Sequence, residues 1–161
     1  MRKLASFIFV LSLGASLSAT AAENDLNSFL KRITAEQPSL KWDAKSAVEG
    51  DFDGSHQASF AVLGYKDKQV TVAVSHKAAD GTVTAQYLAF EINPNYQNAI
   101  CGLPAHLEIS PPACTNGETG EKLPGCTESP GTSGLTLNDN RCDPIYMFWS
   151  HDTKRMMWWR Y

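Results

Sequence analysis

The spacing of apolar side chains predicts one helix near the start of the chain, over residues 24–37. Apolar residues recur there at intervals of three and four: Leu26, Phe29, Leu30 and Ile33. Asn24 or Asp25 can cap the first turn, and Pro38 ends the helix. Because so short a helix is marginal alone, we expect its apolar stripe to cover one face of a sheet.

Three strands are predicted after the helix, at residues 59–65, 69–75 and 82–92. The first run is apolar on both faces, which is typical of a central strand, whereas the second alternates with valine at every other position. Asp80-Gly81 favours a tight hairpin turn between the last two. We therefore expect an antiparallel meander, with residues 40–49 approaching it as an edge.

The end of the chain predicts a second hairpin, with aromatic-rich strands at residues 145–150 and 155–161 around a polar turn. One face of this hairpin must belong to the core. The other face either forms an exposed aromatic patch, which would suit a partner or a carbohydrate, or is covered by the helix. The candidate binding residues are Trp149, Trp158, Trp159 and Tyr161, together with the long loop 111–133.

Together these elements predict an α+β fold in which the N-terminal helix packs on a mainly antiparallel β-sheet. We expect that sheet to consist of the meander and the C-terminal aromatic hairpin. Residues 22–161 would form a single domain with a disulfide-stapled insertion at residues 93–142.

Residues 1–21 have the pattern of a secretory signal peptide: a charged start, an apolar run over residues 4–17 and small residues at Ala19-Thr20-Ala21. Cleavage after Ala22 is the alternative. The apolar run is too short to span a bilayer, so we expect a periplasmic or secreted protein without a membrane span after cleavage. Loss of Arg2 and Lys3 would take the formal charge from −3 to −5, which argues against nucleic-acid binding.

All four cysteines and six of the eight prolines lie in residues 93–142. Export and an even cysteine count predict two disulfides rather than a zinc site, since no C-x-x-C pair is present. If strands at 106–110 and 134–138 pair with Leu107 opposite Leu137, the favoured bridges are nested, Cys101–Cys142 and Cys114–Cys126. Sequential pairing, Cys101–Cys114 and Cys126–Cys142, closes shorter loops and is the alternative.

An acidic loop, Gly50-Asp51-Phe52-Asp53-Gly54, runs into the first strand of the meander. Residues 50–64 resemble the Asp-rich loop of FG-GAP (VCBS-like) repeats, which implies a calcium site with Asp51 and Asp53 as ligands. The pattern departs at three positions: Ser55, His56 and Ser59. Two interpretations stay open: an Asx-type structural turn, in which the two carboxylates accept hydrogen bonds from their own loop, and a weak metal site. A propeller is excluded, because the loop has no second copy.

Candidate catalytic groups have unsuitable spacing. Asp51 and Asp53 share one loop, whereas a glycosidase pair must straddle a bond. His151-Asp152 lies in a predicted turn without a nucleophile motif, and the other histidines are scattered. We therefore expect no enzyme and no cofactor other than possible calcium. The favoured function is a non-catalytic binding domain, an inhibitor or immunity-type protein acting on a hydrolase, with another envelope protein or a glycan as partner. The alternative is an FG-GAP-like ligand-binding domain of the cell envelope. The chain as a whole resembles a small secreted or periplasmic protein.

Overall fold

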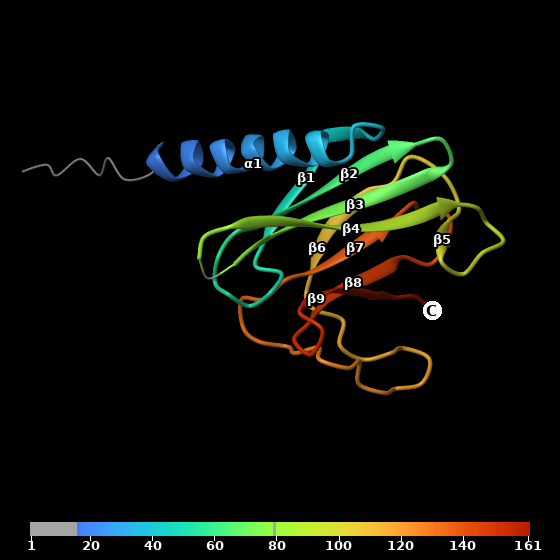
Figure 1. Cartoon of the computed structure of the whole chain (residues 1–161). Coiled ribbons are helices and arrows are strands. Elements are labelled where there is room, and N and C mark those ends of the chain that lie inside the picture. Colours follow the sequence, from blue (N-terminus) through green and yellow to red (C-terminus); the bar gives the residue numbers. More distant parts are fainter. Residues whose placement is uncertain (1–15, 79) are drawn as a thin grey trace, which may run out of the picture.

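The computed structural model describes residues 16–78 and 80–161 and arranges them in three layers (Figure 1). Helix α1 (Ser16–Glu36) lies over a five-stranded sheet, and a four-stranded sheet packs on the opposite side of that sheet. The α+β class is confirmed, although the strands together contain far more residues than the single helix. No helix within the described ranges is both long and apolar enough to cross a membrane.

The first sheet contains, in spatial order, β1 (Lys41–Gly50), β2 (Ser59–Lys66), β3 (Gln69–Lys77), β4 (Val83–Ile92) and β5 (Ala99–Ile100). Its first four strands pair antiparallel with their neighbours, so the predicted meander is confirmed. Strand β1 is an edge strand with an irregular stretch between Asp43 and Val48, and β5 adds a short parallel pair to the end of β4.

Helix α1 covers the outer face of this sheet, as its apolar stripe predicts. Phe29 and Ile33 are buried against Phe60, Val62 and Ala73. The helix ends two residues before Pro38 but begins at Ser16 rather than at Asn24. The alanines at 19, 21 and 22 favour this earlier start, because alanine has the highest helix propensity. Most of the expected signal peptide, residues 1–15, lies outside the described residues.

The second sheet contains β6 (His106–Ser110), β7 (Gly134–Asn138), β8 (Ile145–Ser150) and β9 (Arg155–Trp159) in that order. The C-terminal hairpin is confirmed as β8–β9, but its place in the same sheet as the meander was wrong. Strand β8 pairs with β7 instead, which sets Leu135 opposite Met147 and Leu137 opposite Ile145. These four side chains face the first sheet and bury their surface against its valines and leucines, so two facing sheets share one core.

Both favoured disulfides are confirmed. Cys101 joins Cys142 and Cys114 joins Cys126, and the register that predicted them is present, with Leu107 opposite Leu137. The stretch 93–142 is more than an insertion, however, because it supplies β5, β6 and β7. Its loop 111–133 lies below the second sheet, on the side away from α1 (Figure 1).

Candidate functional site

The acidic loop between β1 and β2 closes one end of the sandwich. Phe52, only 3% exposed, inserts into the core between the sheets, and the Ser133 N–H donates to the Asp51 carbonyl at 2.7 Å. A Cβ at Gly50 would lie 2.9 Å from the Phe52 ring and 3.0 Å from Ser133, so glycine is what allows this close approach. The loop is therefore anchored twice, by the Phe52 side chain in the core and by the backbone bond to Ser133.

Within the loop, the carboxylates of Asp51 and Asp53 accept hydrogen bonds from loop amides, as the Asx-type interpretation predicts. The Ser55 N–H donates to Asp53 Oδ1 at 3.0 Å, and the His56 N–H donates to Asp51 Oδ2 at 2.9 Å. Gly54 and His56 adopt the positive φ angles of a tight turn, 73° and 59°. Asp51 Oδ1 is buried and has no hydrogen-bond partner among the described residues.

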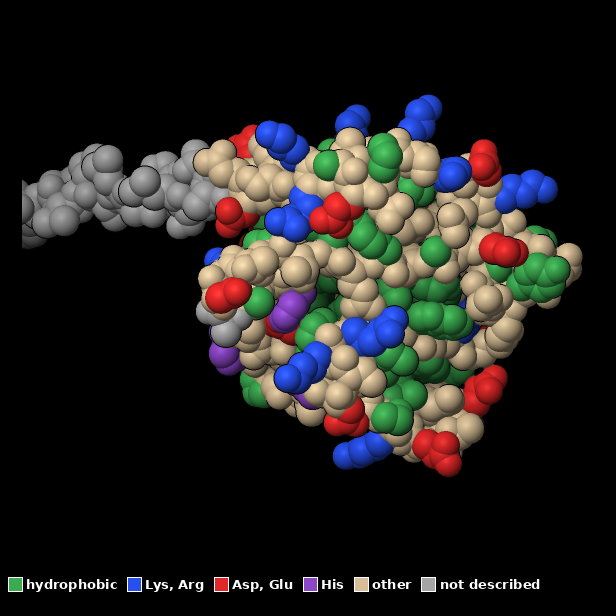
Figure 2. All heavy atoms as spheres, viewed as in Figure 1, with side chains coloured by type: hydrophobic (Ala, Val, Ile, Leu, Met, Phe, Trp, Pro, Cys, Tyr) green, Lys and Arg blue, Asp and Glu red, His purple; other side chains and the backbone are tan. Residues whose placement is uncertain are grey.

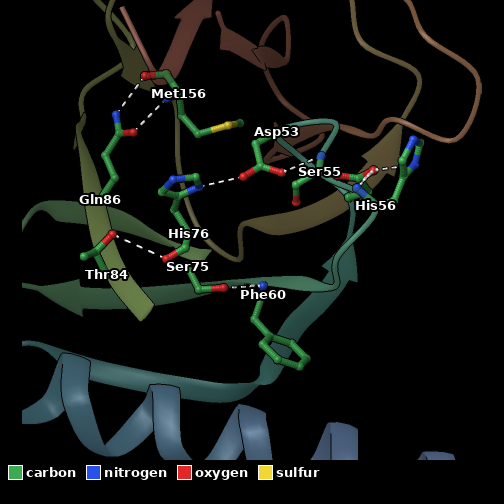
Figure 3. A network of polar contacts seen from close by, with 10 residues as sticks. Asp53, Ser55, His56, Phe60, Ser75, His76, Thr84, Gln86 and Met156 are labelled. Carbon is green, nitrogen blue, oxygen red and sulfur yellow. Dashed lines mark hydrogen bonds and ion pairs between the residues drawn. The ribbon is translucent and has the colours of Figure 1, made fainter. Parts of the chain in front are cut away.

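The second oxygen of Asp53 faces His76 on β3 (Figure 3). Oδ2 lies 2.6 Å from His76 Nδ1, an ion pair by distance whose ring N–H is poorly aligned for a hydrogen bond. The other side of the contact is aromatic, since the His76 ring stacks on Trp149 of β8 with centroids 4.8 Å apart. The structure thus brings Asp53 and Trp149, two predicted site residues, to either side of one histidine that links the two sheets.

These contacts change the pKa of Asp53. Burial alone would raise the pKa of this carboxyl, but hydrogen bonds from Ser55 and the charge of His76 outweigh burial and lower it. Oδ1 of this carboxylate accepts the Ser55 bond and Oδ2 contacts His76, so both oxygens already have a partner. Within the described ranges, no group of three or more His, Cys, Asp or Glu side chains is placed to hold a metal ion.

The Asp53–His76 pair has the form of a base with its orienting carboxylate. Of the residues that the structure describes, no hydroxyl or thiol hydrogen-bonds to the His76 ring, so the pair lacks the nucleophile that such a device would activate. His151 and Asp152 lie in the exposed β8–β9 turn, as expected. The geometry at this end of the sandwich thus suits a structural contact that joins the two sheets.

Trp158 lies at the open side of the sandwich, where β9 faces β4. Its ring meets Phe90 of β4 edge-on at 5.6 Å and remains 37% exposed. Beside it, the side-chain amide of Gln86 donates to the Met156 carbonyl at 2.8 Å and accepts from the Met156 N–H at 2.7 Å. Figure 2 shows hydrophobic side chains gathered in a hollow between the first sheet and the C-terminal hairpin.

Trp159 and Tyr161 lie on the other face of the hairpin, where loop 111–133 covers them in part. Trp159 is 8% exposed, stacks on Tyr146 at 4.8 Å and donates its indole N–H to the Ala113 carbonyl at 3.0 Å. Tyr161 packs edge-on against both rings and stays 42% exposed, with the Gly117 backbone against it. The stapled loop covers part of this face, whereas α1 packs on the first sheet, so the alternative in which the helix covers it is wrong.

Sequence reasoning did not single out Tyr96, Arg141 and Arg160, which join Tyr161 around a second hollow. These residues come from the β4–β5 loop, the Cys101–Cys142 stem and the chain end. They lie in irregular segments without hydrophobic periodicity. The one signal in the sequence was Tyr96, a large aromatic residue in a predicted loop, which the structure leaves exposed.

Comparison with protein-family models, curated proteins and solved structures finds no match to this chain, so the FG-GAP resemblance rests on the residues of the acidic loop.

Proposed function

We propose that this protein is a non-catalytic, disulfide-stapled binding domain that recognises another protein in the periplasm or outside the cell. The observation that carries the proposal is the exposure of three large side chains at the C-terminal hairpin. Met157, Trp158 and Tyr161 are 37%, 37% and 42% exposed. Trp158 lies on the side of the hairpin toward β4 and Tyr161 on the opposite face, and we call the three residues together the C-terminal surface. Aromatic residues and methionine are enriched at protein interfaces, and tryptophan and tyrosine dominate binding hot spots.

The framework beneath this surface supports a binding role. Strand β9 is paired with β8 along one edge and bonded to Gln86 at the other. The loop that packs on Tyr161 is closed by the Cys114–Cys126 disulfide. A surface held in place before binding loses less conformational entropy when a partner docks, which favours tight association.

The partner that best suits this design is an exported or incoming hydrolase, with the protein acting as its inhibitor or immunity partner. Such a role requires a rigid surface and no chemistry of its own. The two disulfides are consistent with the oxidising compartment in which the two proteins would meet.

The experiment is a pulldown from envelope extract with the tagged, oxidised protein and with two variants, Trp158→Ala and Tyr161→Ala. Ile109→Ala is the matched control, because Ile109 is 45% exposed on β6 and lies outside the C-terminal surface. We expect a specific protein to be recovered by the wild type and the control, and to be depleted with both variants. Equal recovery by all four proteins would contradict the proposal.

A second candidate, cation binding at the acidic loop, is favoured by the buried and unpartnered Asp51 Oδ1. A cation there would complete the bonding of that oxygen and fit the FG-GAP-like pattern. His76 already contacts the second oxygen of Asp53, so a cation would have to displace His76 or bind Asp51 without a ligand from Asp53. This candidate therefore stands behind the binding domain.

A further inference from the structure

The second hollow, of about 610 Å³, is formed where three segments meet: residues 94–97, residues 140–143 with Cys101, and residues 160–161. Gln97 donates its side-chain N–H to the Tyr161 carbonyl at 2.7 Å, and Arg160 donates to the carbonyls of Gln97 and Ala99. The β4–β5 loop and the chain end are thus bonded to each other. The Cys101–Cys142 disulfide fixes the opposite wall.

Two arginines line this hollow without a carboxylate to neutralise either one. Among the described residues, neither Arg141 nor Arg160 has an acidic group within 4.0 Å, although Asp143 is also in the lining. Both guanidinium groups are held by backbone carbonyls instead, Arg141 by Leu103 at 3.2 Å and Arg160 by Ala99. Each arginine uses one terminal nitrogen in these bonds, which leaves further N–H donors in a fixed position.

Fixed, unpaired guanidinium groups point to an anionic ligand, because their planar fork matches the two oxygens of a carboxylate. They stand out on a chain whose formal charge is −3. Tyr96, 56% exposed, and Tyr161, 42% exposed, add aromatic surface at the same hollow. Tyrosine next to arginine is the composition of a protein-binding hot spot. Two cations are too few for a polyanion such as nucleic acid, which protein surfaces bind through many phosphate contacts.

We propose that this hollow receives a carboxylate side chain of the protein partner, held by Arg141 and Arg160 and flanked by Tyr96 and Tyr161. The inference rests on the proposed function and deepens it, because Tyr161 belongs both to the C-terminal surface and to the hollow. The partner is then a protein that presents an acidic residue next to apolar surface. Removal of the two arginines should weaken partner binding more at low salt than at high salt, because salt screens the charge interaction.

The test is an NMR titration of the full chain in its oxidised form with an acetylated hexaglutamate peptide, with hexaglutamine as the neutral counterpart. We expect saturable shifts confined to residues 94–97, 140–143 and 160–161, and none with hexaglutamine. The double variant Arg141→Gln/Arg160→Gln should weaken hexaglutamate binding at least about tenfold, as loss of charge-assisted hydrogen bonds requires. Arg155 is exposed at the start of β9 and lies outside the hollow, so Arg155→Gln should leave hexaglutamate affinity within about twofold of the wild type.

Because both arginines also bond to backbone carbonyls, Arg141→Gln alone and Arg160→Lys serve as second variants, with melting temperatures to show that they are folded. Each should weaken hexaglutamate binding less than the double variant does. Equal hexaglutamate binding by the wild type and the double variant would overturn the inference. Binding of inorganic phosphate or an acidic oligosaccharide in place of hexaglutamate would overturn it too. The proposed function can fail while this inference holds. That would be the result if the partner were recovered equally with Trp158→Ala and Tyr161→Ala while hexaglutamate still bound to the hollow.

Discussion

Asp139 shows how one buried carboxylate organises the base of the Cys101–Cys142 bridge. Its side chain accepts backbone N–H groups of four residues around the disulfide: Cys101, Gly102, Arg141 and Cys142. Burial would raise the pKa of Asp139, but these four bonds outweigh it and lower the pKa. One of these bonds holds the backbone of Arg141, the residue that we propose to bind a carboxylate, so Asp139 would also position that proposed site.

We expect Asp139→Asn to lower the free energy of unfolding by about 2–3 kcal/mol at pH 7. The charge-assisted hydrogen bonds are lost, and the side-chain N–H₂ of asparagine would face backbone N–H groups, which are donors as well. Because the folded-state pKa is lowered, the stabilisation is complete above the unfolded pKa of about 3.9 and is lost as the pH falls through the folded pKa. The difference between wild type and variant should therefore shrink below about pH 4. Urea denaturation from pH 7 to pH 3 measures it, with exposed Asp143→Asn as the control. A difference that persists unchanged at pH 3 would contradict this account.

At the acidic loop, we predict no tight calcium binding, because loop amides and His76 already engage three of the four carboxylate oxygens of Asp51 and Asp53. Replacement of the third acidic residue of the FG-GAP pattern by Ser55 removes further charge. Calorimetric titration with calcium at neutral pH tests this. Micromolar binding that disappears in Asp53→Asn would make the cation candidate the better one.

At the scale of elements, the side chain of Gln86 takes the place of a neighbouring strand at one position of β9. Its amide makes the same two bonds to Met156 that a paired backbone residue would make. Strand β9 is an edge strand of the second sheet, and β4 is covered only at its end, where β5 pairs with Glu91 and Ile92. An open edge invites pairing with other chains. Gln86 both closes the side of the sandwich and protects β9.

Gln86→Ala should therefore free the Met156 N–H and speed its hydrogen exchange by about tenfold or more, with a loss of about 1–3 kcal/mol in the free energy of unfolding. Hydrogen exchange followed by NMR gives both quantities at residue resolution. Gln57→Ala, in the exposed loop before β2, is the matched control and should change neither. Unchanged exchange at Met156 in Gln86→Ala would show that Gln86 does not hold β9.

The same elements show how far the sequence leads. The helix, the meander and the C-terminal hairpin follow from local periodicity, because each is encoded within a short stretch. The two disulfides follow from the cysteine positions and the register expected for strands 106–110 and 134–138, although Cys101 and Cys142 are 41 residues apart. The division into two sheets does not, since alternation in β7 shows that Leu135 is buried but not which strand lies beside it. The Gln86 bond and the contact of Trp159 with Ala113 join residues far apart in the chain and have no periodic signal.

On the scale of the whole molecule, the two ends of the sandwich have different characters. One end is closed by the acidic loop and the Asp53–His76–Trp149 contacts, which tie the sheets together. The open side and the chain end carry the exposed aromatics and the unpaired arginines. Of the four predicted binding residues, Trp158 and Tyr161 are exposed, while Trp159 is buried and Trp149 is half-buried against His76. The binding role itself stays a prediction for all four.

The central claim is tested most directly by measuring stability and partner affinity together in Trp159→Ala, Trp158→Ala and Tyr161→Ala. Trp159→Ala should lose about 3–5 kcal/mol of unfolding free energy, because it empties a buried site. Trp158→Ala and Tyr161→Ala should lose about 1–2 kcal/mol, since much of each ring is exposed, and remain folded. Their affinity for the partner should fall by about 30-fold, as expected of a hot spot worth about 2 kcal/mol. Full affinity in both exposed variants would contradict the claim that the C-terminal surface is where this protein binds.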